Sequence, residues 1–298
     1  MTQLKAGQAI DKPIYDFPSA TADKTEPIQP RKVIIVEGLF ALDDQLKDLG
    51  DVKTFVDIGT HGRIIRRLLR DVERTGQAPA DILRYFSEVV EPMHDKYVDT
   101  TKRNADFIIN NEYNPKIEAE KSGLHEVQIK FHINMPLAQL DKKIRSLGAD
   151  RIASNKQVDH YYNPSDRDLM KTGEILRIRQ ESGKRILTYK GPKVESSMRV
   201  RPKLEFEIDR DTTRAFLNIY SNKQKTITKI RTTYQSKNGL IFSIDHVEKQ
   251  EGGQVTILGD FMEIRSIDPN VDQAKIAELV RSLGLNNSAP IQQSYFEM

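Results

Sequence analysis

Residues 199–208 read RVRPKLEFEI, a run in which charged and apolar side chains alternate throughout. Successive side chains of a β-strand point to opposite faces of a sheet, so the run predicts a strand with one apolar and one charged face. The charged face carries both signs, being basic from Arg199 to Lys203 and acidic at Glu205 and Glu207. Such a face requires either water or charged partners.

The same period of two recurs along the second half of the chain. We count eight candidate strands, at residues 126–131, 157–159, 176–179, 187–190, 199–208, 229–231, 242–245 and 261–264. Helical spacing of apolar residues interrupts them at residues 137–147, 213–220 and 272–283. We therefore predict an α+β fold with an eight-stranded antiparallel β-barrel. Its charged face would turn inward, and the three helices would cover the apolar outer face.

These charges differ from those of an ordinary solvated sheet face. They recur on one face of strand after strand with few Ser, Thr or Asn among them, and residues 121–298 carry 29 Lys and Arg against 22 Asp and Glu. Charges enclosed in a barrel need partners. A triphosphate bridged by Mg²⁺ or Mn²⁺ would supply them for both signs, because Lys and Arg bind phosphate oxygens while carboxylates bind the metal.

Six short motifs follow one another in this half of the chain. They are Glu126-x-Gln128-x-Lys130, Leu176-Arg177-Ile178-Arg179, Leu187-Thr188-Tyr189-Lys190-Gly191-Pro192, Lys229-x-Arg231, Ile244-Asp245 and Leu258-Gly259-x-Phe261-x-Glu263. Together, and with the later Ser294-Tyr295, they resemble the CYTH family over residues 124–298. That family comprises class IV adenylyl cyclases, thiamine triphosphatases and inorganic triphosphatases, also called triphosphate tunnel metalloenzymes. The resemblance implies a tunnel barrel that takes a nucleotide, thiamine triphosphate or polyphosphate.

The resemblance also implies roles for individual residues. Phosphate binding and stabilisation of the transition state would involve Lys130, Arg177, Arg179, Lys190, Lys229 and Arg231. Binding of Mg²⁺ or Mn²⁺ would involve Glu126, Asp245 and Glu263, with Glu205 and Glu207 as further carboxylates if they face the same lumen. Lys130, placed among other cations, is the candidate for proton transfer.

Two positions depart from the family's pattern. Gln128 stands where the first strand normally has a second Glu, and Arg265 stands where the last strand normally has another Glu. Fewer carboxylates should weaken metal binding. The first hypothesis is metal-dependent hydrolysis of a phosphoanhydride in inorganic, thiamine or nucleoside triphosphate. The alternatives are a class IV-type adenylyl cyclase and a module that binds nucleotide or polyphosphate without turnover.

The first half of the chain shows another pattern. Short apolar runs at residues 33–36, 55–58 and 107–109 predict parallel strands covered on both faces. Helical spacing predicts one helix over residues 64–72, with arginines on its other faces, and a second over residues 82–90 that ends near Pro92. The Pro-, Thr- and Asp-rich stretch before Val33 predicts a loop. We expect an α/β segment over residues 1–112, a linker over 113–123 and the barrel over 124–298.

Motifs in residues 7–112 resemble those of a second family. They are Pro13-Ile14-Tyr15-Asp16-Phe17, Val36-Glu37-Gly38-Leu39, Phe55-Val56-Asp57, Arg66-Arg67-x-x-Arg70-Asp71 and Thr101-Lys102-x-x-Ala105-Asp106, and they are similar to the uridine kinase/phosphoribulokinase family. The resemblance implies a partial P-loop-kinase-like fold. Tyr15 would contact a nucleoside, Glu37 would lie near the phosphate–metal site, and Arg67 and Arg70 would contact ATP phosphates.

Kinase activity is nevertheless not expected in this chain. The sequence contains no Gly-x-x-x-x-Gly-Lys-[Ser/Thr] loop, whose backbone amides and Lys bind the phosphates. The segment is therefore either an N-terminally truncated kinase domain or a degenerate nucleotide-binding or packing module.

Composition argues against several other classes of protein. The chain has no Cys, which rules out disulfides and thiolate metal sites. It has no apolar run of the roughly 20 residues that a membrane span needs and no secretory signal, which favours a cytoplasmic protein without a membrane partner. Aromatic residues are not interleaved with the basic ones, so we expect no nucleic acid partner. The six His show no metal-ligand spacing, and most are expected at the surface or at strand ends. Oligomeric state has no signature in the sequence.

Overall fold

The computed structural model describes residues 1–16, 19, 21–111, 113–116, 125–193, 199–237, 239–266, 273–285 and 289–298. They form two compact units, the first made of residues 1–58 and 90–111 and the second of residues 59–89 and 112–298. The chain therefore passes twice from the first unit to the second. Among the described residues, no helix has the length and apolar character that crossing a membrane requires.

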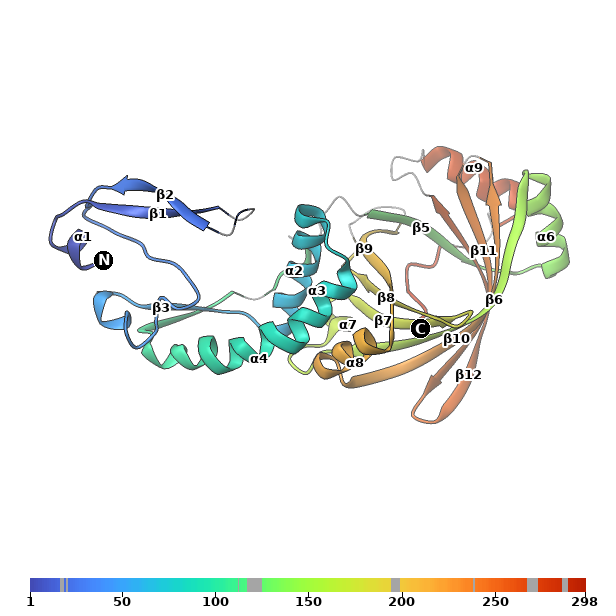
Figure 1. Ribbon diagram of the computed structural model, residues 1–298. Helices are drawn as coiled ribbons and strands as arrows, with labels where there is room; N and C mark the ends of the chain where they lie inside the picture. The colour runs from blue at the N-terminus through green and yellow to red at the C-terminus, as the bar shows by residue number, and fades with distance from the viewer. Residues whose placement is uncertain are drawn as a thin grey trace. The chain divides into compact units, whose positions relative to one another are not determined.

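The second unit contains the predicted barrel (Figure 1). Its eight described strands are β5 His125–His132, β6 Ala149–Asn163, β7 Ile175–Glu181, β8 Lys184–Lys190, β9 Arg199–Ile208, β10 Asn222–Ser236, β11 Leu240–Glu251 and β12 Gln254–Ser266. Every neighbouring pair is antiparallel in the order β10-β11-β12-β5-β9-β8-β7-β6, and β6 pairs with β10 to close the barrel. The prediction of an eight-stranded antiparallel barrel is confirmed.

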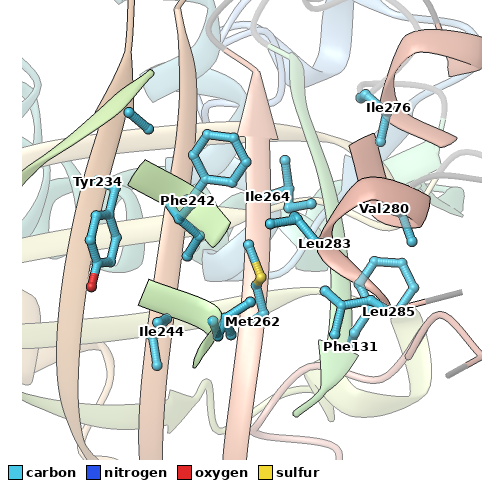
Figure 2. Packing of buried hydrophobic residues seen from close by; sticks show 13 residues of the cluster. Phe131, Tyr234, Phe242, Ile244, Met262, Ile264, Ile276, Val280, Leu283 and Leu285 are labelled. Carbon is cyan, nitrogen blue, oxygen red and sulfur yellow. The ribbon is translucent and has the colours of Figure 1, made fainter. Parts of the chain in front are cut away.

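The apolar faces of the strands point outward and are covered by helices over part of the wall, while Ile230 of β10 and Val255 and Ile257 of β12 stay exposed. Two of these helices are α6 Leu137–Ser146 and α9 Gln273–Leu283. Figure 2 shows Phe131 of β5 and Ile264 of β12 on the side of the cluster where α9 lies, and the whole cluster comprises Phe131, Leu140, Ile144, Ala149, Tyr234, Phe242, Ile244, Met262, Ile264, Ile276, Val280, Leu283 and Leu285. Because side chains alternate along each strand, burial of this face leaves the charged face to the barrel interior.

A third helix, α8 Arg210–Ile219, covers another part of the wall. Asp209 caps its N-terminus by accepting a hydrogen bond from the Thr212 backbone N–H at 2.7 Å. Phe216 of α8 packs edge-on against Tyr162 of β6, with ring centroids 5.1 Å apart. The three predicted helices are thus present on the outer face, and a short α7, Leu169–Thr172, precedes β7.

Two helices from the first half of the sequence also belong to the barrel unit. They are α2 Thr60–Thr75 and α3 Pro79–Tyr85, with a π-helical turn, η2 Phe86–Val90, after them. Their buried apolar residues are Ile64, Ile65, Leu68, Ile82, Leu83 and Phe86. Because α3 packs on α8 and β9, this apolar stripe is part of the same unit as the barrel.

Pro92 does not end the second helical region as predicted. The chain continues through α4 Glu91–Met93, η3 His94–Val98 and η4 Asp99–Asn104. Pro92 lies in the first turn of α4, where a missing backbone N–H is tolerated.

The first unit contains two separate two-stranded sheets among its described residues. It begins with α1 Thr2–Lys5 and an antiparallel hairpin of β1 Ile10–Asp16 and β2 Thr21–Ile28, so the prediction of a loop before Val33 was wrong. Further along are η1 Lys47–Leu49, β3 Thr54–Asp57 and β4 Phe107–Asn110. The strands β3 and β4 pair in parallel, as predicted. Lys102 ties them to η4 through an ion pair of 3.0 Å with Asp57.

The run at residues 33–36 is not a strand, which corrects a second prediction. Its side chains are open to solvent, with Val33 76% and Ile35 87% exposed. In β3 and β4 only Phe55 is buried, while Phe107 is 62% exposed. A strand covered on both faces needs a layer on each side. The described part of this unit supplies no such layers, so the apolar runs stay uncovered.

Candidate functional site

One pocket inside the barrel gathers basic side chains from six strands. Among the described residues, nine cations line it: Lys130 of β5, Arg177 and Arg179 of β7, Lys190 of β8, Arg201 and Lys203 of β9, Lys229 and Arg231 of β10 and Arg265 of β12. The other lining residues are Gln128, Tyr161, Ile175, Glu263, Ser294 and Tyr295. All six residues predicted to contact phosphate therefore line the same pocket. Sequence reasoning had not assigned Arg201 or Lys203 to it.

Two arginines of β7 share one buried carboxylate. Arg179 donates from Nε to Oδ1 of Asp159 at 2.7 Å and from Nη2 to Oδ2 at 3.0 Å. Arg177 donates from Nη1 to the same Oδ2 at 2.8 Å. Burial acts to raise the pKa of Asp159, but the charges of Arg177, Arg179 and Lys229 outweigh it and hold that pKa well below its usual range. Asp159 was missed as a site residue, although its register opposite Arg179 would have indicated it.

A second cluster centres on Arg231 of β10. Its Nε donates to Oδ1 of Asp245 on β11 at 2.6 Å, and its Nη2 donates to Asp245 and to Glu263 on β12. The Tyr295 hydroxyl donates to Oδ2 of Asp245 at 2.9 Å. Burial raises the pKa of Asp245, yet Arg231 and Lys229 outweigh it and lower the pKa below its ordinary value. Asp245 and Glu263 thus converge on one guanidinium.

Lys229 lies between the two clusters. Its Nζ is 3.8 Å from Oδ2 of Asp159 and 3.8 Å from Oδ2 of Asp245, and its side chain is 2% exposed. Burial, followed by the charge of Arg231, lowers the pKa of Lys229 to about 7. An amine with such a pKa exchanges its proton near neutral pH. Lys229 is therefore a second candidate, beside Lys130, for proton transfer.

Glu205 and Glu207 lie two residues apart on β9 but have different surroundings. Glu205 accepts a hydrogen bond from Thr188 at 3.0 Å and lies 3.3 Å from Nζ of Lys203. Burial raises the pKa of Glu205, but Lys203 and Arg177 overcome this and lower it to about 2. Glu207 is exposed and pairs with Lys184 at 2.8 Å. Neither Glu205 nor Glu207 is among the residues that line the pocket, but Glu205 lies 3.7 Å from Arg177, which does line it.

The last residues of the chain form part of the pocket wall. The Tyr295 ring lies under Lys130, whose Nζ is 3.8 Å from the ring centroid, and 5.2 Å from Nζ of Lys229. Phe296 stacks on Tyr161 with ring centroids 4.8 Å apart. Lys225 donates to the Phe296 carbonyl at 2.8 Å. These contacts place an apolar and aromatic segment against the cations.

Two carboxylates of the barrel are suited to a divalent cation whose other ligands are phosphate oxygens of the substrate. Among the side chains that the structure describes, no group of three or more Asp, Glu or His could hold a metal. Glu263 lines the pocket, and Asp245, which does not, converges with it because both accept from Arg231. Mg²⁺ is commonly bound by one or two carboxylates together with phosphate oxygens, so this pair fits such an ion. Glu126 lies on β5, and its side chain is outside the described part of the structure.

The two departures from the family's pattern face each other. Gln128 of β5 and Arg265 of β12 are direct partners in the strand register. Both line the pocket. At this point the wall presents an amide and a guanidinium, so it adds to the positive charge of the pocket.

The four residues predicted from the kinase-like motifs belong to different units. Tyr15 and Glu37 are exposed in the first unit. Arg67 and Arg70 lie on α2 in the second unit, where both pair with Asp71 at 3.4 and 2.6 Å. The hydrogen bond from Arg70 is the largest cause of a lowered pKa for Asp71.

A buried polar cluster joins α2 to the strand that carries Arg177. His61 of α2 is fully buried, with Nε2 3.0 Å from Oε1 of Glu174 and Nδ1 3.0 Å from the Tyr220 hydroxyl. Tyr189 of β8 donates to the same oxygen of Glu174 at 2.9 Å. Arg167 lies 3.3 Å from the other oxygen. Glu174 immediately precedes β7, so α2 is anchored beside a pocket strand.

Two family models match consecutive parts of the chain. Residues 1–118 match the phosphoribulokinase / uridine kinase family. Residues 124–295 match the CYTH domain, which is more than half of the chain.

Individual relatives match over limited lengths. A uridine kinase of Bacillus pumilus (strain SAFR-032) is 45% identical over 111 residues, which are 37% of this chain and 53% of that protein. The inorganic pyrophosphatase TTM2 of Arabidopsis thaliana is 27% identical over 212 residues, 70% of this chain and 30% of that protein. The chain thus spans about half the length of the uridine kinase and less than a third of TTM2. Among solved structures, the PH1819 protein from Pyrococcus horikoshii OT3 is 29% identical, with a TM-score of 0.45 over 58% of this chain and 96% of that one.

Proposed function

The chain belongs to the CYTH domain family, and from this premise we propose that its barrel hydrolyses a phosphoanhydride bond of a triphosphate-containing substrate. The observation that carries the proposal is the convergence of nine Lys and Arg side chains, among the described residues, on one pocket of the barrel. Few ligands other than a polyanion can satisfy so many cations at once. The substrate would be inorganic, thiamine or nucleoside triphosphate.

Phosphate binding would fall to the guanidinium and ammonium groups of the wall. Arg177 and Arg179 of β7 face the pocket beside Lys229 and Arg231 of β10, with Lys130 and Lys190 on further strands. Guanidinium groups bind phosphate oxygens through paired N–H donors. Donors held in place by buried partners stabilise charge as it builds up on the transferred phosphoryl group, because they need little reorganisation.

A proton could be held or delivered at Nζ of Lys229. Its pKa of about 7 allows it to be either neutral or charged when substrate arrives. Its place between Asp159 and Asp245 keeps the amine inside the lumen, away from bulk water. Proton transfer by a group with a pKa near the working pH is the most effective kind.

A divalent cation, Mg²⁺ or Mn²⁺, would be held by Asp245 and Glu263, with Glu126 as a third candidate from the sequence. It would supply Lewis-acid polarisation of a phosphoryl oxygen. Arg231 now uses the same carboxylate oxygens, so cation and guanidinium would compete for them.

The test is a product analysis of the purified chain. Tripolyphosphate, thiamine triphosphate and ATP are each incubated with Mg²⁺ or Mn²⁺, and phosphate, pyrophosphate and cyclic AMP are measured while calorimetry records binding. The proposal expects release of phosphate or pyrophosphate from at least one of these substrates. Cyclic AMP with pyrophosphate from ATP would instead identify a cyclase. Binding without any product would contradict the hydrolase.

Two lysines of β8 provide a matched pair for this assay. Lys190 lines the pocket, whereas Lys184 is exposed and pairs with Glu207. We expect Lys190→Ala to lower kcat/KM by about 100-fold, the usual effect of removing one donor to a developing anion. Lys184→Ala should leave kcat/KM unchanged.

A second candidate function, binding without turnover, is favoured by Gln128 and Arg265. Each replaces an acid that the family's pattern would provide, and the two are paired across β5 and β12. Gln128→Glu combined with Arg265→Glu would restore both carboxylates. If the wild-type chain binds tripolyphosphate but releases nothing, gain of Mg²⁺-dependent release in this double variant would favour the binding module.

A further inference from the structure

Asp159 of β6 is placed behind the phosphate-binding arginines. It is completely buried, and its two oxygens accept three hydrogen bonds from Arg177 and Arg179. Both arginines line the pocket, but Asp159 does not. A bound anion would therefore meet the guanidinium groups and leave the carboxylate on their far side.

The strand register explains this arrangement. Asp159 lies directly opposite Arg179 in the β6–β7 pair, and Arg177 lies two residues further along the same face. The carboxylate can therefore accept from both guanidinium groups at once. A guanidinium has five N–H donors, and Asp159 uses two of Arg179 and one of Arg177. Each guanidinium thus keeps further donors while its plane is fixed.

The charge of Asp159 also offsets repulsion between neighbouring cations. Arg177, Arg179 and Lys229 all lie within 3.8 Å of its oxygens. Three cations so close together repel one another strongly in a buried site. The carboxylate lets the arginines converge before any ligand arrives.

We propose that Asp159 is a positioning residue of the pocket, which orients Arg177 and Arg179 toward a polyphosphate chain without touching it. This inference rests on the proposed function of the barrel, since it concerns how the same pocket acts. It assigns Asp159 to turnover and not to affinity. The ligand class is a linear polyphosphate, of which tripolyphosphate is the simplest probe.

The decisive variant is Asp159→Asn, tested on the full chain with tripolyphosphate. The amide keeps the volume but removes one negative charge behind the arginines and offers N–H groups to other N–H groups. The pocket becomes more positive, so KM should stay the same or fall. The arginines lose their orientation, so kcat should fall by about 10- to 100-fold, the range that small misplacements produce.

Two other roles would give different results. If Asp159 only stabilised the fold, the variant would unfold at lower temperature while kcat and KM of the folded protein stayed unchanged. If Asp159 contacted the substrate or its metal, KM would rise. Either result would overturn the proposal.

Glu174→Gln is the matched control. Glu174 is an equally buried carboxylate that accepts from Tyr189 and lies 3.3 Å from Arg167, but it does not line the pocket. Glu174→Gln should lower the melting temperature, but it should not lower kcat while KM stays the same. If Glu174→Gln instead lowered kcat without raising KM, as expected for Asp159→Asn, any buried carboxylate of the barrel would have this effect. That result would also overturn the proposal.

A double variant tests whether Asp159 acts through Arg179. When two residues work through one contact, their effects on kcat are not additive. We expect Asp159→Asn combined with Arg179→Lys to be little worse than Arg179→Lys alone. If the two fold-losses in kcat multiply in the double variant, Asp159 acts through a residue other than Arg179.

A measurement on the wild-type chain covers the case in which Asp159→Asn does not fold. The Nε–H group of Arg179 donates to Asp159, so its NMR signal should be slow to exchange with water. We expect this signal to persist when tripolyphosphate is added. Its loss on binding would show that Arg179 leaves Asp159 for the ligand, contrary to the proposal.

The outcomes separate the positioning role from the proposed hydrolysis. If the wild-type chain binds tripolyphosphate without releasing phosphate, hydrolysis fails, and the positioning role is judged by whether the Arg179 signal persists on binding. If the wild-type chain is active and Asp159→Asn matches it in kcat and KM, only the positioning role fails. Absence of any tripolyphosphate binding by the wild-type chain overturns both.

Discussion

The two units use similar apolar residues in opposite ways. In the barrel unit, helices cover apolar side chains of β5, β10, β11 and β12, and Ile64 of α2 is fully buried. In the first unit, Ile35 and Phe107 are open to solvent in the described structure. An apolar run becomes buried only where a second layer covers it. Hydrophobic patterning therefore indicates that a run needs a covering layer of helix or sheet, but it does not show whether the fold provides that layer.

Removal of α2 and α3 should have the largest effect. Six buried side chains of this region, at about 1.5–3 kcal/mol each, are comparable with the roughly 5–15 kcal/mol by which a whole domain is stable. We expect a chain of residues 113–298 to lose cooperative unfolding by urea, followed by circular dichroism. A chain of residues 59–298 should keep it. Equal behaviour of the two chains would mean that α2 and α3 are not part of the barrel unit.

A smaller loss should follow from His61→Ala. The change removes hydrogen bonds to Glu174 and Tyr220 in a fully buried cluster and leaves a cavity. We expect the free energy of unfolding to fall by about 3 kcal/mol, measured in urea. His246→Ala is the control, because His246 is half-exposed and pairs with Asp260 at the surface. Its loss should stay below about 1 kcal/mol. Similar losses for both would break the comparison between buried and surface polar pairs.

The charges of the barrel interior allow a prediction about pH. The folded-state pKa of Lys229, about 7, lies below its ordinary value of 10.5. Because the fold favours the neutral amine, the unfolded chain binds more protons between these values. Stability from this group is therefore complete above pH 10.5 and is lost as the pH falls through 7.

Polyphosphate should reverse this preference, since an anion favours the charged amine. At pH 8 we expect tripolyphosphate binding to take up close to one proton. Calorimetry in two buffers of different ionisation enthalpy measures the uptake. Lys229→Arg stays charged throughout and should abolish this uptake. An unchanged uptake in that variant would assign the proton to another group.

The smallest effect should come from Ile35→Ala in the first unit. Ile35 is 87% exposed, so its truncation should change the free energy of unfolding by less than about 0.5 kcal/mol. The matched change Ile64→Ala in α2 should cost about 3 kcal/mol. Thermal unfolding of both variants gives the contrast. A large loss for Ile35→Ala would show that its face is covered in solution.

Much of the barrel was predictable because alternation and register are local properties. Period-two patterns indicated the strands. Arg177 and Arg179 are two residues apart on β7, as Lys229 and Arg231 are on β10, so both members of each pair point to the same face, which is the inner one. The hairpin of β1 and β2 was missed because its residues are mainly polar and exposed, so no apolar face marks them. The structure shows the two strands paired from Ile10 with Ile28 to Asp16 with Thr21.

Other features depend on contacts between distant parts of the chain. His61 resembles a surface residue in sequence, and its burial arises from Glu174 and Tyr220, more than 100 residues away. Asp159 lies within the long strand β6, and only its register with Arg179 reveals its place behind the pocket. Such residues carry no local signal, because their surroundings are created by the fold.

The place of Tyr295 in the pocket wall has a consequence for the order in which the protein is made. The first barrel strand, β5, pairs with β12, and Tyr295 then packs over Lys130 of β5. The ribosome synthesises β12 more than 100 residues after β5, so one edge of β5 stays unpaired until β12 has been made. Newly made chains are therefore most exposed to aggregation shortly before synthesis reaches the pocket's last residues, and a chaperone that shields strand edges would matter most in that interval.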